Sequence, residues 1–287
     1  MAERIDKILA HEGFGSRKDI RKLLHNCEVC INGVRVTDAG KQLDPQRDII
    51  TIDGEAVDLH QNLYIMMNKI MHTVSSNKDG EHQTVFDLLD DSMRTPYLAE
   101  KLHLVGRLDM DTEGLLLFTT DGELTHRVTS PKTHIDKSYF CLLAHPEDEA
   151  HWSQIEKSFA EGIEVGPEDN EAGFRCKPAS VKRATLEEYE FYTKNSSVAE
   201  KIVLELSDDE AASDKSASQN HQQLYAQSAI LTITEGKYHQ VKRMFQAVGN
   251  RVVFLKRISM GKLQLDTTLL PGEYKLLSED EVLQICL

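Results

Sequence analysis

Short apolar runs bounded by Gly, Asp and Asn recur along the chain and predict a protein that contains β-sheet. The clearest run is Leu115–Phe118, which lies between Gly114 and an Asp-Gly pair and predicts a buried strand between two turns. Another strand is predicted over Ile135–Leu143, where alternation puts Lys137 and Tyr139 on the same side. Further strands are predicted over residues 49–52, 63–67, 184–186, 201–206, 229–234, 252–255 and 263–265.

Helical spacing marks other segments. Two short helices are predicted over Arg4–Leu9 and Ser16–Leu24, because Ser16 is a good N-cap and apolar residues recur at positions 20, 23 and 24. A hairpin is predicted next, over Val29–Val36, with Asn32-Gly33 at its turn. Further helices are predicted over residues 82–89, 122–128 and 238–248. The second helix carries four basic residues on the face opposite its apolar stripe: Arg17, Lys18, Arg21 and Lys22.

The length and the polar stretches suggest two domains. A chain of 287 residues can bury more than one core. A short polar linker at residues 58–62 predicts a small domain over 1–58 and a larger one over 63–287. Within the larger domain, residues from about 195 to 227 are rich in Ser and acidic side chains, which predicts a flexible acidic insertion.

The net charge of −14 argues against nucleic-acid binding until its distribution is considered. Residues 145–228 carry 18 acidic and 8 basic side chains, whereas residues 229–262 carry one acidic and seven basic side chains. A local basic face decides phosphate binding, so the overall acidity does not exclude RNA.

The cysteines and the hydropathy exclude several classes of protein. Of five cysteines, only Cys27 and Cys30 have metal-like spacing, and no second pair or histidine group follows them. We therefore expect no zinc site and reduced thiols in a cytoplasmic protein. No apolar run approaches the ~20 residues of a membrane span, and the N-terminus lacks the features of a signal peptide, so no membrane partner is expected.

The sequence Gly106-Arg107-Leu108-Asp109 precedes the clearest predicted strand and is the strongest candidate for chemistry. Glycine permits close approach of a ligand, arginine suits phosphate, and a loop aspartate beside a rigid strand can act as a nucleophile or a base. Three other interpretations are a surface ion pair, a calcium loop, and a metal site of Asp109 and Asp111 for a sugar nucleotide. A calcium loop is disfavoured because its twelfth position is Thr120.

The N-terminal segment resembles the alpha-L RNA-binding module of the ribosomal small-subunit protein four family. The resemblance covers residues 1–57 and rests on Arg4-Ile5-Asp6-Lys7, Ser16-Arg17 and the hairpin with its Asn-Gly turn. It implies binding to structured RNA, largely through phosphate and shape, by way of the basic helix face.

Three motifs that follow this module resemble the RsuA type of pseudouridine synthase, which modifies a uridine in small-subunit ribosomal RNA. They are Gly106-Arg107-Leu108-Asp109, Lys137-Ser138-Tyr139 and the run from Glu235 to Met244 that contains Tyr-His-Gln-Val-Lys. One departure is visible, because the family often has Lys-Pro-x-Gly where this chain has Lys69-Ile70-Met71-His72.

The resemblance implies an α+β fold in which a mixed, mostly antiparallel sheet carries the cleft, next to a small S4-like domain. It also implies a reaction without cofactor or metal on ribosomal RNA of the small subunit or its assembly intermediate, by a protein expected to be a monomer. Asp109, Tyr139 and Lys242 would be catalytic, and Arg107, Lys137 and Arg243 would contact the substrate. The alternative is a non-catalytic RNA-binding or ribosome-assembly factor of the same fold.

Overall fold

The computed structural model describes residues 2–12, 14–45, 47–57, 62–94, 96–130, 132–194, 196 and 224–286. The chain divides into two compact units, Met1–Leu63 with Asp90–Leu102, and Tyr64–Leu89 with His103–Leu287. The strand predicted over residues 201–206 and most of the predicted acidic insertion lie outside the described residues.

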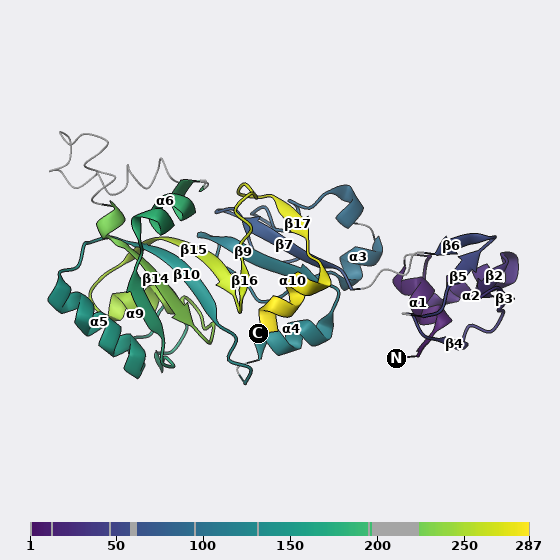
Figure 1. Cartoon of the computed structure of the whole chain (residues 1–287), viewed down its shortest axis with the longest axis horizontal. Helices are drawn as coiled ribbons and strands as arrows, with labels where there is room; N and C mark the ends of the chain where they lie inside the picture. The colour runs from purple at the N-terminus through teal and green to yellow at the C-terminus, as the bar shows by residue number, and fades with distance from the viewer. Residues whose placement is uncertain are drawn as a thin grey trace. The chain divides into compact units, whose positions relative to one another are not determined.

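The first unit packs two helices against short strands (Figure 1). Its elements are β1 (Glu3–Arg4), α1 (Ile5–His11), α2 (Arg17–Asn26), β2 (Val29–Ile31), β3 (Val34–Arg35), β4 (Gln42–Leu43), β5 (Ile50–Ile52), β6 (Glu55–Val57), the 3-10 helix η1 (Asp91–Met93) and α3 (Pro96–Lys101). Four strands form an antiparallel sheet in the order β3-β2-β5-β6, and β1 pairs with β4. Ser16 begins α2 in a reciprocal capping box with Asp19, so the predicted N-cap is confirmed.

The second unit is built on a mixed sheet in the order β13-β14-β10-β15-β9-β7-β17. Its strands are β7 (Tyr64–Lys69), β8 (His103–Leu104), β9 (Thr112–Thr119), β10 (Lys137–Leu143), β11 (Glu164–Val165), β12 (Phe174–Arg175), β13 (Ser180–Arg183), β14 (Ser228–Ile233), β15 (Val252–Met260), β16 (Leu263–Gln264) and β17 (Tyr274–Leu276). Only the β9–β15 pair is parallel among the described pairings of this sheet. The α+β class with a mostly antiparallel sheet is confirmed.

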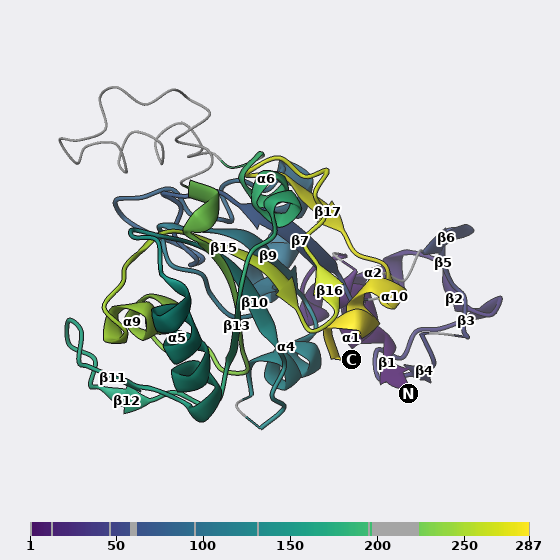
Figure 2. The same cartoon turned by 60° about the vertical axis from the view of Figure 1, so that its left-hand side comes forward.

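Helices cover both faces of this sheet. They are α4 (Gly122–Thr129), α5 (Glu149–Glu161), α6 (Leu186–Lys194), α9 (Gln240–Ala247), α10 (Glu279–Leu283) and the 3-10 helix η2 (Gln284–Cys286). Figure 1 and Figure 2 both show α5 and α9 side by side, and Phe159 meets Phe245 edge-to-face between them at 5.3 Å. One apolar cluster joins α4 and α10 to the β9 half of the sheet, and another joins α6 to β10 and β14.

Most predicted strands are confirmed, with β9 and β15 longer than predicted, but two elements are wrong. Residues 82–89 form turns instead of a helix, and the helices of this region come later, at η1 and α3. The strand predicted at 184–186 falls between β13 and α6, because the chain turns at Thr185 and Leu186 begins a helix. None of the described helices combines the length and the apolar character needed to cross a bilayer.

Candidate active site

A lysine on α9 reaches the loop that precedes β9. The Lys242 ammonium lies 2.6 and 2.8 Å from the two carboxylate oxygens of Asp111, and 3.5 Å from Oδ2 of Asp109. The Asp109 side chain is 34% exposed, so a ligand can reach it. Its loop leads directly into β9, which is buried along its whole length. The structure therefore brings together two of the three residues predicted to be catalytic.

This geometry bears on the alternative of a metal site. A divalent cation held jointly by Asp109 and Asp111 would need the space between their carboxylates. The Lys242 ammonium already pairs with both carboxylates and supplies positive charge there. The arrangement thus favours organic acid–base or nucleophilic chemistry over a metal-held sugar nucleotide.

A second lysine supports the same loop from inside the protein. Lys69, at the end of β7, is 0% exposed, and its ammonium donates to the carbonyl oxygens of Asp109 and Thr112 at 3.0 and 2.9 Å. It also donates to Ile70 and Met110 at 3.2 and 3.3 Å. Burial lowers the pKa of Lys69 to about 8, against the opposing effect of the nearby carboxylates of Asp111, Asp109 and Glu113. The buried lysine fixes the backbone that carries Asp109.

Tyr139 lies on β10, where Arg257 of β15 is its direct neighbour across the strands. The Tyr139 side chain is 7% exposed. The Arg257 guanidinium donates from Nε to the Leu115 carbonyl at 2.8 Å, and its Nη2 is buried with no hydrogen-bond partner among the described residues. Burial and the charge of Arg257 lower the pKa of Lys137, two residues before Tyr139, to about 8. Two cations therefore lie close to this tyrosine.

Arg243 has a different environment from the other predicted substrate contacts. It is 2% exposed, and its guanidinium donates to the carbonyl oxygens of Gly166, Ala172 and Tyr238 at 2.5, 2.8 and 3.3 Å. The guanidinium also lies 4.5 Å from the centre of the Phe174 ring. Arg243 thus holds the β11–β12 connection against α9, and we do not include it among the proposed RNA contacts.

Replacing Arg243 with Met is expected to lower the free energy of unfolding by about 2–4 kcal/mol, because partly buried carbonyl groups would lose their donor. Urea denaturation measures this change. Lys237→Met is the matched control, since Lys237 also lies over the Phe174 ring, at 4.1 Å, but is 44% exposed. The control should cost less than about 1 kcal/mol. Equal losses in the two variants would contradict a structural role specific to Arg243.

The remaining predicted contacts are on the surface. Arg107 is exposed in the loop before Asp109. In the first unit, the basic residues of α2 are all exposed, as the helix pattern predicted: Arg17, Lys18, Arg21 and Lys22. They form a basic helix face opposite the buried Ile20 and Leu24.

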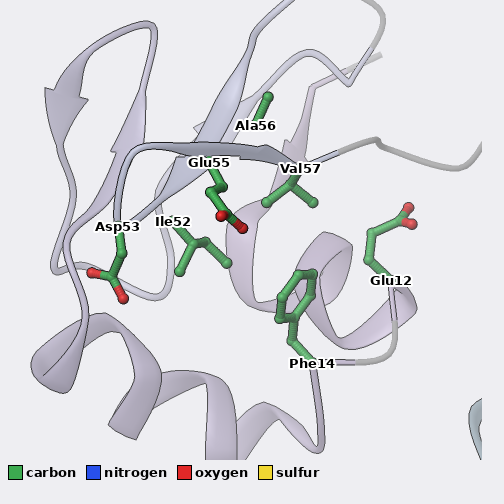
Figure 3. Close-up of a pocket in the computed structure, with 7 residues that line it drawn as sticks. All are labelled: Glu12, Phe14, Ile52, Asp53, Glu55, Ala56 and Val57. Carbon is green, nitrogen blue, oxygen red and sulfur yellow. The ribbon is translucent and has the colours of Figure 1, made fainter.

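The first unit also contains a pocket of the opposite character (Figure 3). Phe14, Ile52, Ala56 and Val57 supply apolar walls, and three carboxylates line it as well: Glu12, Asp53 and Glu55. Carboxylates repel phosphate, so this pocket is unsuited to the RNA backbone. The basic face of α2 is the better surface of this unit for RNA.

Several residues of the site were not identified from the sequence. Lys69 was noted only for the residues after it, although a lysine that ends an apolar strand is itself a signal of a special environment. Arg257 was noted only as part of a basic segment. His239 lies in the third motif, and its Nε2 is 3.8 Å from Oδ2 of Asp109. Its proximity to Asp109 depends on two segments far apart in the sequence.

The second unit has a mixed sheet and a loop aspartate paired with a lysine, and the first unit has a helix with a basic face. This combination suits an RNA-modifying enzyme. Comparison with known sequences confirms this class. The chain belongs to the RNA pseudouridylate synthase family, whose sequence profile matches residues 63–247, and the S4 domain profile matches residues 3–49. Members of the family named as pseudouridine synthases are isomerases, so the chain is an RNA-modifying isomerase.

Individual relatives match over nearly the full length. The chain is 39% identical over 281 residues to a Bacillus subtilis protein described as an uncharacterized RNA pseudouridine synthase, YtzG, covering 97% of this chain and 96% of that protein. It is 36% identical to ribosomal small subunit pseudouridine synthase A of Pasteurella multocida, covering 97% of each chain. A crystal structure described as pseudouridylate synthase matches with a TM-score of 0.56 and 33% identity, covering 98% of this chain and 99% of that chain. The resemblance drawn from the motifs is confirmed at the level of the family.

Proposed function

We propose that the chain converts one uridine of small-subunit ribosomal RNA to pseudouridine, with Asp109 as the essential carboxylate. The observation that carries the proposal is the Lys242–Asp109 contact of 3.5 Å at an aspartate that is 34% exposed. A nearby cation favours the ionised carboxylate, which either role of Asp109, nucleophile or base, requires. Relatives named ribosomal small subunit pseudouridine synthase A support the choice of RNA.

The reaction breaks the bond between the ribose and nitrogen one of uracil, and then joins the ribose to carbon five. The base rotates between these steps, carbon five loses its proton, and nitrogen one gains a proton. The product is an isomer of the substrate, so no oxidant, reductant or transferred group is needed. Asp109 would either attack the sugar or remove its proton in the first step, and in both cases Lys242 would stabilise its charge.

The uridine has to leave its stack to reach Asp109, because atoms inside a helix are covered by their neighbours. Tyr139 would stack on the flipped uracil and assist removal of the proton at carbon five. Lys137 would bind a phosphate of the substrate strand, with the Arg257 guanidinium adding positive charge beside it. Arg107, exposed in the loop before Asp109, would bind phosphate or fill the gap that the base leaves.

The basic face of α2 would supply a second RNA contact, independent of the site around Asp109. Phosphate contacts of this type give affinity without sequence selectivity. Covalent linkage of the two units then raises the effective concentration of RNA at the catalytic unit. We propose that the protein acts in this way as a cytoplasmic monomer.

Lys137→Arg is expected to remove a pH dependence that the wild type shows. With a pKa of about 8, Lys137 is mostly charged at pH 7 and mostly neutral at pH 9. Its phosphate contact should therefore weaken as the pH rises, and kcat/KM should fall by up to about tenfold between these values. Arginine stays charged, so its profile should be flatter over this range. Parallel declines in both proteins, measured under single-turnover conditions, would count against this contact.

The experiment that tests the proposed function uses small-subunit ribosomal RNA made with uridine tritiated at carbon five. Pseudouridine formation releases this tritium to water. The wild-type protein should release it from small-subunit RNA, or from an assembly intermediate, and not from large-subunit RNA. A chelator should have no effect once RNA folding is controlled. Absence of release from naked RNA and from particles alike would instead support a non-catalytic RNA-binding or assembly role.

A further inference from the structure

The connection between β11 and β12 forms an acidic loop over residues 166–173, which lies against the start of α9. Its two ends are held by Arg243, which donates to the carbonyl oxygens of Gly166 and Ala172. Near the tip, the backbone groups of Glu168 and Glu171 hydrogen-bond to each other at 2.9 and 3.1 Å. The side chains at the tip are therefore presented from a closed turn with anchored ends.

Two acidic side chains of this loop contact two consecutive residues at the start of α9. The Tyr238 hydroxyl donates to Asp169 Oδ2 at 2.8 Å, and His239 Nδ1 lies 3.1 Å from Glu168 Oε2. The rings of Tyr238 and His239 stack, with centres 3.8 Å apart and planes at 21°. His239 and Asp169 both have a φ of +49°, a backbone conformation that costs energy in residues other than glycine. These contacts therefore hold His239 in a strained but defined position.

The other nitrogen of the same imidazole faces the candidate catalytic residue. His239 Nε2 lies 3.8 Å from Asp109 Oδ2, so the ring stands between two carboxylates. If Nδ1 donates to Glu168, a neutral ring would present a lone pair to Asp109, which suits only a protonated aspartate. A charged ring presents a second N–H, which attracts an ionised Asp109. The hydrogen bond to Asp169 raises the pKa of Tyr238 to about 12, so this tyrosine adds no charge near neutral pH.

Lys242 and His239 make their closest approach to Asp109 at the same oxygen. Lys242 and His239 lie 3.5 and 3.8 Å from Oδ2. Two partners at one oxygen favour a single orientation of the carboxylate. Outer partners that orient a functional group in this way change rates without touching the substrate.

We propose that His239, oriented by Glu168, is a positioning residue that keeps Asp109 ionised and fixed in orientation. Glu168 of the acidic loop is then part of the catalytic apparatus, because it orients the ring of His239. This inference rests on the proposed function of Asp109 and extends it to two residues outside the predicted site.

The test compares His239→Ala and Glu168→Gln with the wild type in the tritium-release assay under single-turnover conditions. His239→Ala should lower the maximal rate about 10- to 100-fold, the range typical of outer-sphere positioning partners, with RNA affinity within about twofold. Added imidazole should restore part of the lost rate. Glu168→Gln should lower the rate by a smaller factor in the same direction. Thermal unfolding of each variant shows whether the fold is retained.

Glu171→Gln is the matched control, because it removes an exposed carboxylate of the same turn and leaves the contacts of Glu168 and Asp169 intact. Its rate should stay within about twofold of wild type. An equal loss in Glu171→Gln and Glu168→Gln, or weaker RNA binding with an unchanged rate in His239→Ala, would overturn the positioning role. Asp109→Asn in the same assay distinguishes failure of the positioning role of His239 from failure of the proposed function. If that variant is inactive while His239→Ala is fully active, only the positioning role fails, whereas an active Asp109→Asn removes the proposed function itself.

Discussion

Asp109→Asn is expected to reduce pseudouridine formation by about a thousandfold or more, with RNA affinity nearly unchanged. Asparagine has almost the same shape as aspartate but carries no charge, so it can neither attack the sugar nor accept its proton. The Lys242 ammonium would retain its two contacts with Asp111, at 2.6 and 2.8 Å, so we expect the loop to keep its structure. Tritium release from labelled small-subunit RNA measures the rate, and a filter-binding assay measures the affinity.

Asp111→Asn is the control for this prediction, because it removes the carboxylate that is closest to Lys242. This variant should keep at least about a tenth of the wild-type rate, since Lys242 would still lie next to Asp109. The opposite result, with Asp111→Asn inactive and Asp109→Asn active, would show that the essential carboxylate is Asp111 and not Asp109.

Gly114→Ala is expected to destabilise the second unit by more than about 4 kcal/mol and to abolish activity with it. Gly114 has a φ of +99°, and an added Cβ would lie 2.2 Å from the carbonyl oxygen of Arg257 and 2.8 Å from its nitrogen. The atoms it would meet are backbone atoms of β15, at the parallel pairing with β9, so they cannot move aside alone. Soluble yield and urea denaturation would show the effect.

Gly106→Ala is the matched variant on the other side of Asp109. Its φ is +79°, but an added Cβ would have nothing within 4 Å. Only the conformational cost remains, about 1–2 kcal/mol, so the protein should fold. If both variants were equally stable, the close approach of β9 and β15 would not be the reason why position 114 requires glycine.

Local patterns predicted the elements that depend on local causes. The run Leu115–Phe118 identified β9, because this strand is buried along its whole length and needs no polar face. Ser16 and the Asn32-Gly33 turn identified a helix start and a hairpin, since each satisfies or shapes the backbone within a few residues.

Elements in the acidic middle of the chain were harder to predict from the sequence. Helix α5 was not predicted, although Trp152, Ile155 and Phe159 recur at helical spacing and are buried. Acidic residues surround them, so the charge of this segment masks the apolar periodicity. The turns at residues 82–89 show the opposite error, because apolar Val85 and Leu89 are buried without a helix.

Asp109 was a candidate from its position in the loop before a strand, and Lys242 was selected by resemblance alone. Their contact could not be derived from periodicity. The same limitation applies to Lys69, because three of its four carbonyl partners lie 40 to 43 residues later, between Asp109 and Thr112. The sequence does not show that the Lys69 ammonium is buried, because its partners are brought to it only by the tertiary structure.

Because Lys69 is buried, chemical labelling of its amine can report local opening of the structure around it. An amine-reactive reagent needs a free, accessible amine, and the Lys69 amine is 0% exposed and bonded to four carbonyl oxygens. Its acylation therefore requires the segment from Asp109 to Thr112 to separate from β7. The rate of labelling at this one amine, followed by mass spectrometry, measures how often the loop that carries Asp109 separates from β7. Exposed lysines of the same chain, such as Lys18 and Lys22, supply the unhindered rate for comparison.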